Sequence, residues 1–120
     1  MSDVSESIML STKKKNNVAA DYVAFDDDFV SYINAALSEL NQLGVGPEEG
    51  LQIEDSSTTW DEFYDDPRLN GIQAFVGLRV RLLFDPPPTS FAIQMMENQL
   101  IEMGWRLLAA QTDIEKEEAV

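Results

Sequence analysis

The chain has 120 residues, a formal charge of −14 at pH 7, and neither cysteine nor histidine. This length suits a single domain with one core. The lack of cysteine excludes a disulfide framework, a thiolate nucleophile and a thiolate metal site. Because histidine, a phosphate loop and a nucleophile motif are also missing, we expect no catalytic residue, no cofactor and no metal site.

The negative charge is concentrated in one part of the sequence. Residues 21–66 hold 13 acidic residues and no Lys or Arg, whereas residues 1–20 and 67–112 each carry a net charge of +1. Such a surface repels DNA phosphates, because DNA-binding proteins gain affinity from Lys and Arg. Three interpretations stay open: a solvated surface that maintains solubility, a surface past which DNA slides, or a docking site for a basic partner.

The N-terminal segment predicts a short helix from about Val4 to Asn16, opened by Asp3 and closed by the triplet Lys13–Lys15. An acidic start and a basic end both suit the helix dipole. We interpret the lysines as a solvated helix end rather than a nucleic-acid patch. The apolar residues form neither a signal peptide nor a membrane span, so we expect a soluble protein.

The next segment predicts an amphipathic helix that Asp26 caps and Gly44 ends. Its apolar residues recur at intervals of three and four: Phe29, Ile33, Ala36, Leu37, Leu40 and Leu43. The acidic triplet Asp26–Asp28 lacks the alternating spacing of a calcium loop. We therefore interpret the triplet as N-terminal capping and not as a metal site.

Residues 45–58 predict an exposed acidic loop with two glycines, one proline and four acidic residues: Glu48, Glu49, Glu54 and Asp55. A brief apolar alternation at Leu51 and Ile53 is compatible with a short hairpin within the loop. The loop ends at Thr59, which with Glu62 forms a capping box before a single helical turn. The aromatic residues of that turn should fill the core: Trp60, Phe63 and Tyr64.

A third helix should begin at Pro67, whose missing N–H is not needed in a first turn. Apolar residues cover most of its circumference, so it should be nearly buried. Arg79 and Arg81 lie about 200° apart on such a helix. At least one of them should meet a carboxylate or a neighbouring subunit, unless both extend to solvent. The three prolines at 86–88 then end the helix at Asp85.

A fourth helix should start at Thr89 or Ser90. Its main apolar stripe is widened by further apolar residues: Phe91, Met95, Ile101, Trp105 and Leu108. That is more apolar surface than a four-helix monomer of this size covers. Trp105 lies between Gly104 and Arg106, and it is either core filling or an anchor between subunits, because Trp and Arg are enriched at interface hot spots.

We therefore expect a mainly α fold, a compact bundle of about four helices with a proline-rich elbow between the last two and one exposed acidic loop. Residues 1–112 should form one domain with a flexible start at 1–3, and residues 113–120 a flexible acidic tail. The candidate interface residues are Arg79, Arg81, Trp105 and Arg106.

Several segments resemble the small head-tail connector proteins of tailed bacteriophages. They are FDDDFVSYINAALSELNQLGVGPEEG, TTWDEF, and VRLLFDPPPTSF followed by MGWRL. The resemblance spans about Ile8 to Leu108, and its strongest parts are LNQLGVGP at Leu40–Pro47 and RLLFDPP at Arg81–Pro87. The chain departs from the expected pattern at Pro88 and Gly104, which affects the elbow angle and local contacts.

The resemblance implies a structural virion protein, an adaptor that forms a dodecameric ring of its own copies on the portal protein of the filled capsid. Such a ring extends the DNA channel, lets genomic DNA pass without sequence-specific binding, and offers an attachment surface to a stopper or tail-completion protein. The implied location is the virion neck, after assembly in the host cytoplasm and with no membrane partner.

In such a ring, we expect the third and fourth helices to form the subunit core and the lateral contacts. The acidic loop, with Glu48, Glu49, Glu54 and Asp55, should face the channel or the next ring. The alternative is an acidic DNA mimic that inhibits a nucleic-acid enzyme. The charge of the chain is the feature that suggests this alternative.

Overall fold

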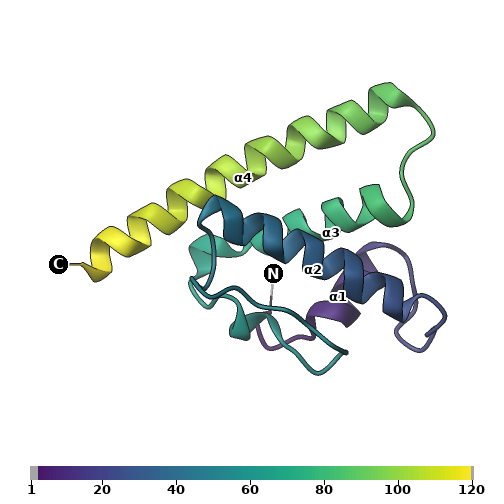
Figure 1. Ribbon diagram of the computed structural model, residues 1–120, viewed down its shortest axis with the longest axis horizontal. Helices are drawn as coiled ribbons and strands as arrows, with labels where there is room; N and C mark the ends of the chain where they lie inside the picture. The colour runs from purple at the N-terminus through teal and green to yellow at the C-terminus, as the bar shows by residue number, and fades with distance from the viewer. Residues whose placement is uncertain (1–2, 120) are drawn as a thin grey trace.

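The computed structural model describes residues 3–119 and has the mainly helical fold that the sequence predicts. Across these residues, four α-helices and two 3-10 turns follow one another: α1 (Ile8–Lys15), α2 (Asp26–Leu43), η1 (Trp60–Glu62), η2 (Pro67–Leu69), α3 (Gly71–Phe84) and α4 (Ser90–Glu118). In Figure 1, α3 occupies the middle, α4 lies above it, and α1 lies below. The helices α2 and α4 both pack on α3.

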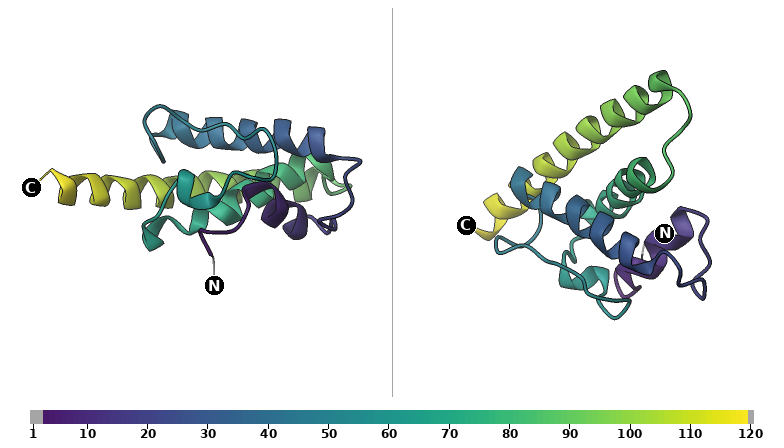
Figure 2. Two further views of the ribbon diagram at one scale, coloured as in Figure 1. Left: turned by 90° about the horizontal axis from the view of Figure 1, so that it is seen from below. Right: turned by 45° about the vertical axis from the view of Figure 1, so that its right-hand side comes forward.

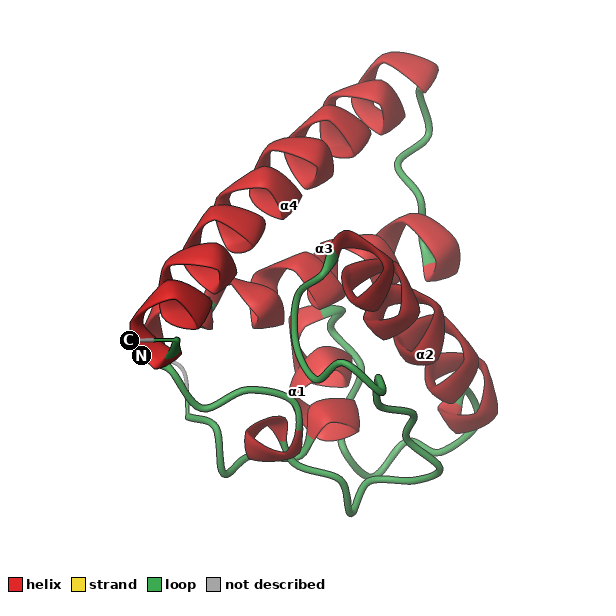
Figure 3. Cartoon of the chain, turned by 60° about the vertical axis from the view of Figure 1, so that its left-hand side comes forward, coloured by secondary structure: helices red, strands yellow, loops and turns green. Residues whose placement is uncertain are grey.

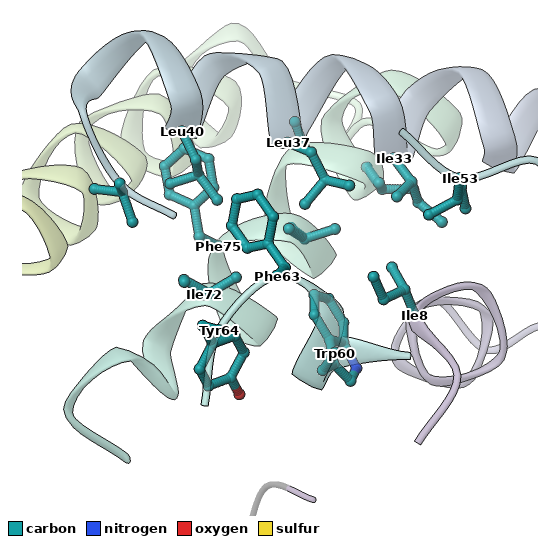
Figure 4. Close-up of a cluster of buried hydrophobic side chains, with 14 of the residues drawn as sticks. Ile8, Ile33, Leu37, Leu40, Ile53, Trp60, Phe63, Tyr64, Ile72 and Phe75 are labelled. Atoms are coloured by element: carbon teal, nitrogen blue, oxygen red, sulfur yellow. The ribbon is translucent and has the colours of Figure 1, made fainter. Parts of the chain in front are cut away.

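The core lies between α2, α3 and the segment that carries η1 (Figure 4). Apolar side chains of α2 point down onto the aromatic residues of the η1 segment, and Ile8 of α1 closes one side. Trp60, Phe63 and Tyr64 are all buried, which confirms the prediction that this turn fills the core. The indole Nε1 of Trp60 donates a hydrogen bond to Ser11 Oγ at 2.7 Å, so its polar atom is satisfied inside the core.

Most of the expected helix ends are confirmed. Gly44 follows α2 in the left-handed conformation, with φ of 96°, and Asp85 follows α3. Thr59 forms the expected capping box with Glu62. Thr89 caps α4, because its hydroxyl accepts a hydrogen bond from Ala92 N at 3.1 Å.

The start of α1 differs from the prediction. The helix begins at Ile8 with Ser7 as its N-cap, and residues 4–6 form a non-helical turn and bend in place of the expected first helical turn. Residues 4–8 pair with residues 58–61, where Trp60 N donates to Glu6 O and Asp61 N donates to Val4 O. These backbone bonds replace the helical bonds that the local sequence favours.

Two further helix starts are shifted. Phe25, rather than Asp26, occupies the N-cap of α2, and the acidic triplet lies in its first turn. Pro67 begins the 3-10 turn η2, and α3 itself starts at Gly71. The carboxylate of Asp66 accepts a bond from Arg68 N and caps η2.

The prediction that all three lysines at 13–15 are solvated is wrong for Lys13. Lys13 is completely buried, and its ammonium group donates to Ala20 O, Tyr22 O and Asp26 Oδ1. Lys14 and Lys15 are exposed, as expected. The connector between α1 and α2 wraps around the Lys13 ammonium, which the spacing of charges alone does not reveal.

The acidic loop, residues 45–58, contains no strand and hence no hairpin. Asn34 on α2 takes the place of a strand partner, because its side chain bonds Ile53 N at 2.8 Å and Ile53 O at 3.0 Å. Ile53 is thereby held in the core. The loop is anchored at its middle rather than freely exposed.

Helices α3 and α4 run in opposite directions and diverge toward the elbow that joins them (Figures 1 and 3). Helix α4 continues without a break through residues 113–118. Near its end, Glu117 bonds the guanidinium of Arg68. The proposed domain limit at residue 112 and the flexibility of both termini stay predictions, and residues 1–2 and 120 lie outside the described part.

Candidate interaction surfaces

The outer face of α4 carries four large apolar side chains that point into solvent. They are Phe91, Met95, Ile101 and Trp105, and we call this set the α4 surface. Trp105 is 65% exposed and Phe91 is 75% exposed, so neither fills the core. Of the two interpretations of Trp105, core filling is therefore wrong. Its role as an anchor between subunits stays a prediction.

The contact of α4 with the rest of the molecule is narrow, and this explains the exposed face. Among the described residues, α4 buries Leu100, Gly104 and Leu107. A Cβ atom on Gly104 would lie 3.1 Å from Leu43 Cδ1, so the glycine permits a close approach of α4 to α2. Residues 90–99 are all exposed or half-buried. The expectation that α4 helps to form the core is therefore confirmed for the part from Leu100 onward, whereas the first third of the helix, residues 90–99, contributes no fully buried side chain.

Trp105 borders a small apolar hollow between α2, α3 and α4. The hollow measures about 210 Å³, and its lining residues are Glu39, Leu43, Phe75, Leu100, Ile101, Gly104 and Trp105. The Glu39 carboxylate also binds Arg79 in a bidentate pair, with Nε–Oε1 and Nη2–Oε2 distances both 2.8 Å. Arg79 thus meets a carboxylate, which is one of the outcomes expected for the arginine pair on α3.

The other two candidate arginines form local bonds. Arg81 Nε donates to Asp85 O at 2.9 Å, one turn further along, and so supports the elbow. Arg106 pairs with Glu102 on its own helix, and both side chains are exposed. Glu39 binds Arg79 and lines the same hollow as Trp105, whereas Arg81 bonds Asp85 at the elbow. These contacts lie within one copy of the chain, so the interface role of the arginines stays a prediction.

The elbow is held by an aromatic cluster at the end of α3. The Phe84 ring packs edge-on against Phe25 at 5.1 Å and against Phe29 at 4.8 Å between ring centroids. These contacts attach the end of α3 to the start of α2. The three prolines then limit the backbone between Asp85 and Thr89, so the start of α4 is directed away from α3.

The acidic loop presents its four candidate residues to solvent: Glu48, Glu49, Glu54 and Asp55. Asn41 Nδ2 donates to Pro47 O at 2.9 Å, and Gly46 N donates to Gln111 Oε1 at 3.1 Å. The pKa of Asp55 is lowered, because its carboxylate accepts hydrogen bonds from the hydroxyl and amide of Ser57.

Sequence reasoning missed the two asparagines of α2 that hold this loop. Asn34 and Asn41 are seven residues apart and lie on one side of α2. A polar pair at that spacing beside an apolar stripe is the signal that could have identified them.

A second exposed apolar surface lies at the end of α1 and the connector that follows it. Leu10, Val18, Ala19 and Ala20 line a mostly apolar hollow of about 380 Å³, and we call this set the α1 surface. Lys14 lies at its edge. The connector then continues with exposed Tyr22 and Val23. Sequence reasoning did not single out these residues, because their spacing follows no helical period.

Within residues 3–119, no group of three or more acidic, histidine or cysteine side chains is placed to hold a metal ion. The described helices also include none that is both long enough and apolar enough to cross a membrane. What the described part does offer is two apolar surfaces, a fixed elbow and an anchored acidic loop.

Comparison with known proteins identifies the family. No curated protein and no solved structure matches the chain. A family model described as phage connector protein matches residues 8–113, nearly the whole chain. The resemblance to head-tail connectors is thereby confirmed, and the chain belongs to the phage connector protein family.

Proposed function

We propose that the protein forms a dodecameric ring on the portal protein, extends the DNA channel and provides the attachment surface for a stopper or tail-completion protein. Family membership makes the protein a structural head-tail connector of the virion neck. The ring, the portal as docking partner and the passage of DNA go beyond that membership. Support for them comes from the surfaces of the chain.

The α4 surface is the observation that carries the proposal. Burying a Phe, Ile or Met side chain contributes about 1.5–3 kcal/mol each. A helix that leaves Phe91, Met95 and Ile101 in water forgoes several such contributions in the monomer. An apolar face of this size is typical of a protein whose stable form includes a neighbour.

The charge distribution supports a channel that does not retain DNA. The acidic loop is anchored to α2 through Asn34 and Asn41, so its carboxylates are held in place rather than spread by a mobile segment. Fixed negative charge facing a channel repels phosphates and prevents tight contacts. We propose that Glu48, Glu49, Glu54 and Asp55 face the channel or the next ring.

The alternative function, an acidic DNA mimic, is less well supported. A mimic needs regularly spaced exposed carboxylates and a basic enzyme partner. The apolar α4 surface would have no role in such a protein. Family membership also favours the connector.

The decisive experiment adds purified protein to portal-bearing, DNA-filled heads. Electron microscopy should then show an additional ring below the portal, and averaging should give its symmetry. The control uses heads that lack the portal, to which the protein should not bind. A portal that stays unoccupied at saturating protein would exclude the proposed docking.

The role of the loop has its own test. A variant carrying E48Q, E49Q, E54Q and D55N removes four charges, and the amide introduced at position 55 keeps an acceptor for Ser57. We expect this variant to form rings but to retain or release DNA abnormally, or to fail in tail joining. The matched control removes four exposed charges outside the loop, with D65N, D113N, E115Q and E118Q. Unchanged DNA retention and tail joining in the loop variant would contradict this role.

A further inference from the structure

We infer that neighbouring copies join head-to-tail, with the α4 surface of one copy packed on the α1 surface of the next. The inference rests on the proposed ring and names the two surfaces that would build it. Its partner is a second copy of this chain.

The two surfaces lie on opposite flanks of the molecule. Helix α1 packs on α3 and α2 from below, and α4 packs on α3 and α2 from above (Figures 1 and 2). The middle of α4 turns Leu100 and Leu107 inward, so Trp105 and Ile101 face away from α1. Each flank therefore exposes a different apolar surface.

This arrangement favours a heterologous contact. A two-fold dimer pairs one surface with itself and leaves the other uncovered. Pairing two different surfaces on opposite flanks covers both, and the contact repeats from copy to copy until the ring closes. The α4 surface supplies protruding side chains, and the α1 surface supplies a hollow of about 380 Å³ to receive them.

Charge supports the same pairing. Two copies with a formal charge of −14 each repel one another, and the repulsion is smallest where the least acidic segments meet. The α1 surface lies within residues 1–20 and the α4 surface within residues 67–112, and each of these segments has a net charge of +1. Lys14 and the exposed Glu6 both line the hollow of the α1 surface, and the exposed pair Glu102 and Arg106 lies beside Trp105 on α4, so each rim carries charges of both signs that can pair across the contact.

The absence of cysteine from the chain makes a cross-linking test unambiguous. Ala109→Cys places a thiol one turn after Trp105, and Ala19→Cys places one in the α1 surface; both positions are exposed. The double variant is bound to portal-bearing heads and treated with a short bismaleimide. The same treatment is applied to concentrated free protein. Denaturing gels and mass spectrometry identify the linked species.

We expect the double variant to give a ladder of linked copies, at least about tenfold more abundant than higher species from either single variant. Mixing the two single variants should give dimers linked from position 109 of one copy to position 19 of the other. The control pairs Ala109→Cys with Ser56→Cys in the acidic loop, a position that is also exposed and should give no ladder.

Each outcome decides between the hypotheses. Dimers of the Ala109→Cys variant alone, at the level of the mixture, would show a two-fold contact and overturn the inference. Cross-links from either position to the portal protein would show a different occupant and overturn it too. A ring on the portal without a ladder overturns the inference and leaves the proposed function standing. A ladder in free protein, together with unoccupied portals, would support the inferred contact and overturn the proposed docking on the portal. Failure of both experiments would overturn both proposals.

Discussion

Lys13 Nζ lies 2.7 Å from Asp26 Oδ1, and this ion pair joins the end of α1 to the start of α2. Lys13 is completely buried, whereas Asp26 is partly exposed. The ammonium group also donates to Ala20 O at 3.1 Å and Tyr22 O at 2.8 Å. All three of its donors are thereby satisfied, which is the condition for a buried lysine.

Lys13→Ala should lower the free energy of unfolding by about 3 kcal/mol, since it removes the buried partner of the ion pair and leaves two carbonyls without their donor. Lys14→Ala, at the exposed neighbouring position, should change it by less than about 0.5 kcal/mol. Urea denaturation of the two variants measures the difference. Equal midpoints would contradict the structural role of Lys13.

Trp105→Ala should impair assembly on the portal without changing the stability of the fold. Because Trp105 is 65% exposed, its removal should leave the free energy of unfolding within about 0.5 kcal/mol of the unmodified protein. Occupancy of portal-bearing heads should fall sharply. The matched control is Leu107→Ala, two residues further along α4, which removes a buried side chain and should cost about 2–5 kcal/mol of stability. Thermal unfolding combined with electron microscopy of heads tests both. Full occupancy with Trp105→Ala would argue against its role as an anchor.

Gly46→Ala should be more destabilising than Gly50→Ala. Both glycines have positive φ, at 91° and 79°. A Cβ on Gly46 would lie 2.5 Å from the buried ring of Phe63, whereas a Cβ on Gly50 would make ordinary contact with Asn41 at 3.5 Å. We expect a loss of about 3 kcal/mol for the first variant, from strain and overpacking, and about 1 kcal/mol for the second, from strain alone. Urea midpoints that rank the other way would be inconsistent with the packing of the loop on the core.

The end of α4 should loosen at acid pH. Hydrogen bonds from Arg68 lower the pKa of Asp66 and of Glu117 below their ordinary values of 3.8 and 4.5. Because both pKa values are lower in the folded protein, these contacts stabilise it above the ordinary values and are lost as the pH falls through the lowered ones. Arg68→Gln should therefore reduce the protection of residues 112–118 at pH 7.

The same variant should have no effect once both carboxylates are protonated. Amide exchange of the unmodified protein and of Arg68→Gln, each corrected for the intrinsic pH dependence of exchange, measures the difference at each pH. A difference that persists after both carboxylates have titrated would show that they are not responsible. Arg106→Gln, which breaks a pair on the surface of α4 itself, is the control and should leave residues 112–118 unchanged.

Local sequence determined where most helices end. Gly44, the Thr59 capping box, the three prolines and Thr89 each act on backbone groups within about four residues, so their effect can be predicted without the rest of the chain. The helical stripe of α2 likewise predicted five of its buried side chains, Phe29, Ile33, Ala36, Leu37 and Leu40, whereas the sixth residue of the stripe, Leu43, is exposed. The family resemblance also depended on contiguous residues, and it covered nearly the same range as the family match.

Tertiary structure alone decided the start of α1, the burial of Lys13 and the outward direction of Trp105. Residues 4–7 are not helical because backbone groups of Val4, Glu6 and Ile8 pair with residues 58–61, some fifty positions away in the chain. Trp105 is exposed because α4 touches α2 and α3 along one narrow strip; the helical period placed Trp105 beside the main apolar stripe, but it did not decide whether residues beside that stripe are buried. A periodic pattern gives the direction of each side chain around its helix, but only packing selects the face that is buried.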